Sequence, residues 1–238
     1  MSEVLIGVAH GSRDPRAADT VSSLMSLVRA RLDGTVDVRT AYLGHAAPSL
    51  PSVLSAAPAR SRITVLPLLL TDAYHSKVDI PRLLPAAVAY GVTLGPHPLL
   101  ITALERRLSE TAAEDRAGTG VVLAAAGSSD PGANAAVARL AARWQLTGGW
   151  RAVVPGYASA AAPTPGAAVR GLLSRSGVRR VVVATYLLSP GVFADRIRRE
   201  ALDAGAAAVS PVLGAAPELA DIVLEHFRAA RIQHRAAA

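Results

Sequence analysis

The sequence predicts an α/β protein made of two similar doubly wound parallel-sheet domains that arose by internal duplication. Two observations lead to this fold class. Segments of the first half recur in the second half at nearly constant separations. Within each half, apolar strand-like runs alternate with helix-like segments, which is typical of a parallel sheet covered by helices.

The duplication is visible in three pairs of segments. "GVAHGSRDP" recurs as "LAAAGSSDP", "YLGHAAPSLPSVL" as "YASAAAPTPGAAV", and "LGPHPLL" as "LGAAPEL". The separations are 116 (126 − 10), 115 (157 − 42) and 119 (213 − 94) residues. Such steady spacing indicates two copies of one supersecondary unit.

The first copy is expected to begin with a buried strand and a well-capped helix. Asp14 is a good N-cap and Pro15 a favourable first helical residue, and apolar residues then recur at helical spacing to Leu32. The β-branched run at 62–70 is typical of a strand buried on both faces. The expected strands are 3–10, 36–43, 62–70 and 91–94, and the expected helices are 15–32, 47–57, one from about 78, and 98–114.

The second copy follows the same plan. Its strands are expected near 121–126, 151–157, 179–188 and 207–213. The polar stretch 112–120 is the expected boundary. The predicted domains are therefore residues 1–117, carrying the chemistry, and residues 118–238, a degenerate repeat that completes the site.

Composition excludes several classes of site. The chain has no cysteine, so disulfides, thiolate metal sites and cysteine nucleophiles are ruled out. No apolar run is long enough for a membrane span, and the N-terminus lacks the basic start of a signal peptide, so a cytoplasmic protein is expected. The net charge of +7 favours an anionic partner, but scattered arginines and 4% aromatic residues fit nucleic acid poorly.

Histidines distinguish the two copies. In open parallel sheets, ligands bind at the C-terminal ends of the strands, and four histidines follow predicted strands of the first copy. None survives in the second copy, although caps and strands do. The histidines are His10, His45, His75 and His97, and their counterparts are Ala126, Ala160, Phe193 and Ala216.

This asymmetry predicts a single active site in the first copy. We expect His10 and His75 to be functional, as ligands of a divalent metal ion or as general bases. His45 could be solvated, and His97, between prolines, is best read as structural. His226 lies in the polar tail and is given no role.

Other catalytic motifs are missing. "HGSRDP" is not a nucleophile elbow, and Ser12 recurs as Ser128 in the copy without histidines, which favours a turn or cap role. There is no Walker A sequence and no G-x-G-x-x-G after a strand. A metal-dependent hydrolase would need more acidic ligands than the chain offers.

The pair "VAHGSRDP" and "LPLLLTDAYHSKVDIP" resembles the sirohydrochlorin chelatases, in their duplicated long form, over the whole chain. The resemblance implies ATP-independent insertion of Co²⁺ or Fe²⁺ into sirohydrochlorin, on the way to cobalamin or sirohaem. The metal ion is then a substrate, and no prosthetic cofactor is expected. A monomer or weak dimer is expected, with the anionic tetrapyrrole as the partner and neither nucleic acid nor membrane involved.

The resemblance also assigns residues. It implies that His10 and His75 are the catalytic, metal-handling pair, with the macrocycle between the two domains. The tetrapyrrole carries eight carboxylates, and the neighbouring Arg13, Arg16 and Lys77, together with Ser12, are the expected substrate-binding residues.

The chain departs from the family pattern at one position. The family commonly has an acidic residue where Gly44 stands here. Asp72 or His45 could replace it at the metal. If neither does, the alternative is a non-catalytic tetrapyrrole or metal carrier on the same fold. Imidazole and carboxylate ligands accept cobalt, iron, nickel and zinc alike, so the sequence does not select the metal.

Overall fold

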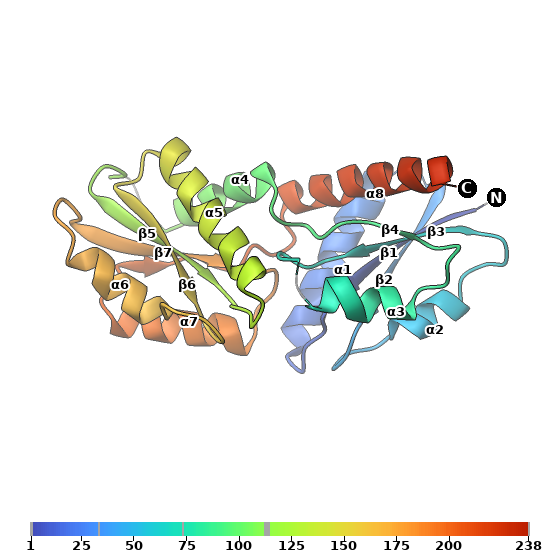
Figure 1. The fold of residues 1–238 in the computed structure, drawn as a ribbon, viewed down its shortest axis with the longest axis horizontal. Helices are drawn as coiled ribbons and strands as arrows, with labels where there is room; N and C mark the ends of the chain where they lie inside the picture. Colours follow the sequence, from blue (N-terminus) through green and yellow to red (C-terminus); the bar gives the residue numbers. More distant parts are fainter. Residues whose placement is uncertain (1, 33, 73, 112–114, 238) are drawn as a thin grey trace. The chain divides into compact units, whose positions relative to one another are not determined.

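The computed structural model describes residues 2–32, 34–72, 74–111 and 115–237. The chain divides into two compact units (Figure 1). Unit 1 comprises Met1–Leu99 together with Ala215–Ala238, and unit 2 comprises Leu100–Gly214. Each unit contains one four-stranded parallel sheet, as predicted from the two copies.

Unit 1 is built on a sheet with strand order β2-β1-β3-β4, all parallel. Its strands are β1 (Glu3–Ala9), β2 (Val36–Tyr42), β3 (Arg62–Pro67) and β4 (Ala89–Tyr90). Its helices are α1 (Pro15–Ala30), α2 (Leu50–Ser55), the π-helical turn η1 (His75–Asp79), α3 (Ile80–Leu83) and α8 (Pro217–Ala237).

Unit 2 repeats this sheet with the order β6-β5-β7-β8, again all parallel. Its strands are β5 (Thr119–Ala125), β6 (Ala152–Tyr157), β7 (Arg180–Tyr186) and β8 (Ala208–Val209). Its helices are α4 (Pro98–Ser109, apart from its first two residues), α5 (Pro131–Gly148), α6 (Pro165–Leu173) and α7 (Val192–Asp203).

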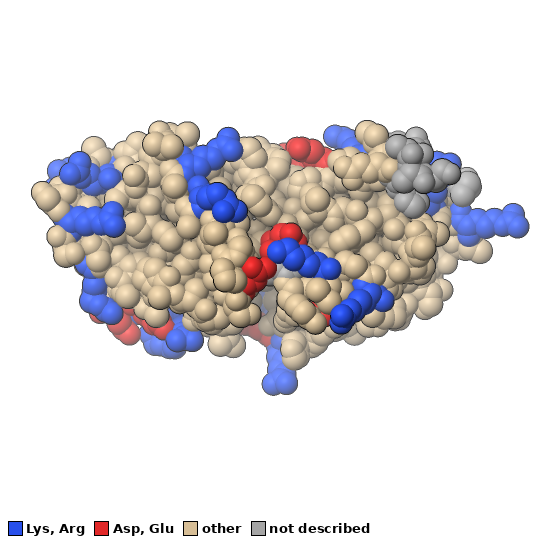
Figure 2. Space-filling model, viewed as in Figure 1, with Lys and Arg blue, Asp and Glu red and all other residues tan. Residues whose placement is uncertain are grey.

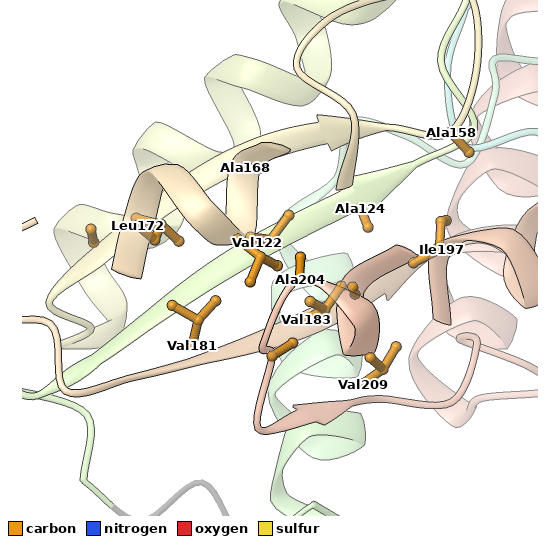
Figure 3. Packing of buried hydrophobic residues seen from close by; sticks show 14 residues of the cluster. Val122, Ala124, Ala158, Ala168, Leu172, Val181, Val183, Ile197, Ala204 and Val209 are labelled. Carbon is orange, nitrogen blue, oxygen red and sulfur yellow. The ribbon is translucent and has the colours of Figure 1, made fainter. Parts of the chain in front are cut away.

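The core of unit 2 shows why these runs form strands. Val122, Val181 and Val183 are fully buried on the central strands and meet Leu172 and Ile197 from the covering helices (Figure 3). Strands buried on both faces read as continuous apolar runs. In unit 1 the equivalent cluster includes Ile6, Val65 and Ile80.

The last helix of each copy belongs mainly to the compact unit that contains the sheet of the other copy. The helix α8 ends the second copy, yet it packs against α1, β3 and β4 of unit 1, as Figure 1 shows. The helix α4 ends the first copy but belongs to unit 2. The compact units therefore exchange these two helices relative to the two copies, and the domains 1–117 and 118–238 stay a prediction about the duplication.

Several element boundaries differ from the predictions. The fourth strand of unit 1 is Ala89–Tyr90 and not 91–94, because the chain leaves the sheet after Gly91 donates its N–H to the carbonyl of Val65. The helix expected from about residue 78 starts earlier, as a π-helical turn at His75. Residues 112–114, in the predicted boundary, lie outside the described residues.

Candidate functional site

The candidate site lies where the first three strands of unit 1 end. The hydrogen-bond ladder between β1 and β2 continues past both strands, since Leu43 N–H donates to Ala9 and Gly44 N–H donates to His10. These bonds hold the backbone of His10 beside the loop that carries His45. On the other side of β1, Leu68 N–H donates to Val8, which aligns the end of β3 with the end of β1.

Three imidazoles gather at these strand ends. The ring centroids of His10 and His75 lie 4.6 Å apart in an edge-to-face arrangement with an interplanar angle of 74°. The ring of His45 lies 6.2 Å from that of His10. The sequence-based expectation that these histidines meet on one rim therefore holds for His10, His45 and His75.

In both members of the central pair, Nδ1 faces an oxygen acceptor. His10 Nδ1 lies 3.0 Å from the carbonyl oxygen of Gly11, and His75 Nδ1 lies 2.6 Å from Oδ2 of Asp79. A carbonyl oxygen can only accept, so this hydrogen bond requires the tautomer of His10 with its proton on Nδ1. In a neutral ring of this tautomer, Nε2 has the free lone pair that can bind a metal ion or accept a proton.

A glycine makes this arrangement possible. Gly11 has φ +89°, and a Cβ atom there would stand 1.7 Å from the carbonyl oxygen of Gly44. Its counterpart Gly127 has φ +84°, with a Cβ position 1.9 Å from the carbonyl oxygen of Ser159. Both copies thus need glycine for the same close approach of two loops.

The loop after β1 is otherwise an ordinary helix cap. Ser12 Oγ accepts the N–H of Asp14, and Asp14 Oδ1 accepts the N–H of Arg16. Ser128 and Asp130 make the same bonds in unit 2, where no histidine is present. Ser12 therefore holds the turn, as its recurrence in the sequence predicts.

The predicted substrate-binding cations differ in how far they are engaged. Nε of Arg16 lies 3.0 Å from Oδ1 of Asp14, and this guanidinium holds the pKa of Asp14 below its ordinary value. Lys77 Nζ lies 3.9 Å from Oδ2 of Asp72. Arg13 is exposed and has no hydrogen bond or ion pair within the described part of the chain.

Asp72 does not join the imidazole pair. Its Oδ1 accepts a 2.6 Å hydrogen bond from Ser76 Oγ, and its Oδ2 faces Lys77. Over the described residues, no group of three or more histidine, aspartate or glutamate side chains is arranged to hold a metal ion. The site is thus a pair of imidazoles with a third imidazole nearby.

His97 is the exception to the predicted rim. Its Nε2 lies 3.3 Å from Oε2 of Glu225, its Nδ1 accepts the N–H of Leu99, and its ring stacks edge-to-face at 5.8 Å on His226. Both Glu225 and His226 belong to α8. These contacts agree with the structural role expected for His97, and they give His226, which the sequence left without a role, a place in the packing of α8.

The corresponding rim of unit 2 keeps the backbone but has no imidazole. Ala158 and Ser159 donate to Ala125 and Ala126, just as Leu43 and Gly44 donate in unit 1. His45 has φ +60° and its counterpart Ala160 has φ +55°, so the loop shape is independent of the histidine. At the position of His75, Phe193 is 43% exposed.

One residue of the site was not predicted from the sequence. Asp79 was not singled out, although "HSKVD" spaces it four residues from His75, a separation that brings side chains together on a helical turn. Tyr74, also unassigned, is largely exposed, with its ring 6.4 Å from that of His75.

Figure 2 shows the lysine and arginine side chains dispersed over the face in view, without a single broad basic patch. Extended nucleic-acid surfaces need basic residues gathered on one face or along a helix. Among the described residues, no helix has the length and apolarity needed to cross a membrane.

The chain matches one protein family along most of its length. The CbiX family model matches residues 4–111 and, a second time, residues 120–230. The two matches coincide with the two copies inferred from the sequence.

Relatives with curated names are chelatases. A sirohydrochlorin ferrochelatase of Priestia megaterium is 28% identical over 208 residues, which cover 83% of this chain and 77% of the relative. A sirohydrochlorin cobaltochelatase of the same organism is 29% identical over 214 residues, covering 83% of this chain and 67% of the relative.

Solved structures share the fold. SirB from Bacillus subtilis with Fe³⁺ superposes with a TM-score of 0.81 at 24% identity, covering 97% of this chain and 96% of that one. The Bacillus subtilis subspecies spizizenii sirohydrochlorin chelatase SirB in complex with cobalt gives a TM-score of 0.76 at 23% identity, covering 97% and 95%.

Proposed function

Because this chain belongs to the CbiX family, we propose that it is an ATP-independent chelatase that inserts Co²⁺ or Fe²⁺ into sirohydrochlorin. The names of its relatives support this reaction. The observation that carries the proposal is the 4.6 Å separation between the ring centroids of His10, which follows β1, and His75, in the turn η1 after the neighbouring strand β3. The divalent ion is a substrate, and the reaction requires no prosthetic group.

The reaction exchanges two pyrrole N–H protons for one divalent ion, with no change in oxidation state. A catalyst must therefore present the ion and accept protons. A neutral imidazole can present the ion or accept a proton, because its free lone pair binds either one. His10 and His75 are the residues to which we assign these tasks.

The small number of ligands suits transfer better than storage. Two imidazoles leave most coordination positions of an ion open, so pyrrole nitrogens can replace water there while the ion is still held. A carrier that retains its metal would be expected to offer three or more protein ligands. The absence of such a group among the described residues therefore favours the chelatase over the carrier.

His45 is the residue we propose in place of the missing acid at Gly44. Its ring is 6.2 Å from His10, and it is exposed. Asp72 is less suited, because Ser76 and Lys77 already occupy its two oxygens. We assign His45 to proton acceptance, while His10 and His75 hold the ion.

Carboxylates of the tetrapyrrole need cationic partners near the imidazoles. Arg13 is three residues from His10, is exposed, and has no partner within the described part of the chain. Arginine binds carboxylates with two parallel hydrogen bonds. We assign Arg13 the main role in orienting the macrocycle, with Arg16 and Lys77 in lesser roles because they already face Asp14 and Asp72.

The test is anaerobic metal insertion followed by the absorption of the macrocycle. His10→Ala and His75→Ala should each lower the rate about 100-fold or more, as expected for loss of a group that transfers protons. His97→Ala, which removes an imidazole engaged with α8, is the matched control and should insert metal normally once its folding is verified. Equal rates for wild type, His10→Ala and His75→Ala would overturn the proposal.

A further inference from the structure

The segment that carries His75 is one residue longer than its counterpart in the second copy. Leu94 N–H donates to Leu69, and Leu213 N–H donates to Leu187, so Leu69 and Leu187 hold equivalent places. Downstream, Ile80 and Ile197 are both fully buried in the cores of their units. Ten residues (70–79) lie between Leu69 and Ile80, whereas nine residues (188–196) lie between Leu187 and Ile197.

The extra residue is absorbed by the π-helical turn. In η1 the N–H of Ile80 reaches back five residues to the carbonyl of His75, whereas α7 is an α-helix from Val192 onward. Proline 81 explains the widening, because in an α-helix its ring would clash with the carbonyl of Lys77. Single π turns of this kind occur frequently at functional sites.

Within this turn, the carboxylate of Asp79 is committed to His75. Oδ2 lies 2.6 Å from Nδ1 of His75, and both side chains are partly buried. Asp79 precedes the short helix α3 but makes no side-chain capping bond to it. Helix capping, the common reason for an aspartate at this position, therefore does not account for Asp79.

The second copy has lost both members of this pair. Phe193 stands where His75 stands, and the residue before the buried isoleucine is Arg196, which pairs with Glu200. The copy without imidazoles thus also lacks the carboxylate and the widened turn. The histidine and the carboxylate that faces it are thus absent together from the second copy, where the carboxylate of this turn, Asp195, stands one residue earlier.

We propose that Asp79 is a positioning residue for His75. It accepts the Nδ1 proton, fixes the tautomer and the ring orientation, and leaves the Nε2 lone pair directed to the substrate metal ion. The role at the metal rests on the proposed chelatase function. His10 has only a neutral backbone carbonyl for the same purpose, and charge-assisted hydrogen bonds are stronger than neutral ones. Carboxylates behind metal-binding histidines act in this way in many proteins.

The test compares Asp79→Asn with Asp79→Glu at one mildly alkaline pH. An asparagine amide can either accept from Nδ1 or donate to it, so Asp79→Asn should no longer fix the tautomer. Asp195→Asn is the matched control, because it removes a carboxylate from the corresponding turn of the second copy. The readouts are the ¹⁵N NMR signals of the His75 ring and the dissociation constant for Co²⁺ without tetrapyrrole.

The proposal predicts that His75 of the wild type carries its proton on Nδ1. In Asp79→Asn the Nε2–H tautomer should appear, and the Co²⁺ dissociation constant should rise roughly 10- to 100-fold. Asp79→Glu should recover most of the affinity, and Asp195→Asn should match the wild type. A wild-type His75 with its proton on Nε2, or unchanged cobalt affinity in a folded Asp79→Asn protein, would overturn the proposal. If the wild type shows the expected tautomer and affinity but inserts no metal into sirohydrochlorin, the chelatase function fails while the positioning role stands.

Discussion

Truncating Phe227 to alanine is expected to weaken the unit that holds His10 and His75, although Phe227 lies in the second half of the sequence. Phe227 is 1% exposed in α8, which packs on α1, β3 and β4. Removing a buried phenylalanine ring costs about 3–5 kcal/mol. That is a large share of the roughly 5–15 kcal/mol that stabilises a typical domain.

Hydrogen exchange measured by peptide distinguishes the two units. The most protected amides of β1 and β3 should lose roughly 10²- to 10³-fold of their protection in Phe227→Ala, following the tenfold change per 1.4 kcal/mol. Ile232→Ala is the matched control on the same helix, because Ile232 is 69% exposed and its truncation should cost under about 0.5 kcal/mol. Loss of protection in β5 and β7, with β1 and β3 unaffected, would refute the exchange of helices and favour domains divided at residue 117.

Three further predictions concern other positions of the chain. Gly11→Ala should destabilise the protein by clearly more than the roughly 1–2 kcal/mol that a positive φ costs an alanine, and it should weaken Co²⁺ binding, because the new Cβ would clash with the carbonyl oxygen of Gly44. Gly34→Ala is the control for the backbone cost alone, since Gly34 has φ +81° and open space around it. Equal losses of unfolding free energy for the two variants in denaturant titrations would contradict this reasoning. Burial, and then neighbouring His97, lower the pKa of His226 below 6.5, so the unfolded chain binds this proton more readily than the folded chain. The free energy of unfolding should therefore decrease as the pH falls from 6.5 toward the lowered pKa. The same loss of stability at acid pH in a His226→Gln protein would show that another group is responsible. Ala126→His combined with Phe193→His should not double the insertion rate, because the second copy lacks the turn and carboxylate that hold His75; a doubled rate would show that imidazoles alone create a site.

Local sequence patterns predicted most of the fold. Asp14-Pro15 marks the start of α1, and the run at 62–70 contains β3. The position of the last helices was not predictable in this way. The helices α4 and α8 begin within the similar segments "LGPHPLL" and "LGAAPEL". An amphipathic pattern indicates which face of a helix is buried but not which sheet that face covers. The contact of His97 with Glu225 and His226 depends on that exchange.

The site, too, was predicted only in part. The loss of histidines from the second copy pointed to His10 and His75, whose rings do meet. The π turn could not be read from periodicity, since it arises from one extra residue ahead of Pro81 and its backbone shape emerges only in the folded chain. Asp79 was not predicted, because the four-residue spacing in "HSKVD" brings the two side chains together only on a helical turn, and the helix was expected to begin at about residue 78.

Multiple-turnover insertion of Co²⁺ into sirohydrochlorin tests the central claim most directly. Anaerobic mixtures with tetrapyrrole and Co²⁺ in large excess over protein should yield many equivalents of metallated product per protein molecule. The yield should fall to the uncatalysed level in the His10→Ala/His75→Ala double variant. Product that stops at one equivalent per protein, or that forms equally fast with the double variant, would contradict catalysis by this pair of imidazoles.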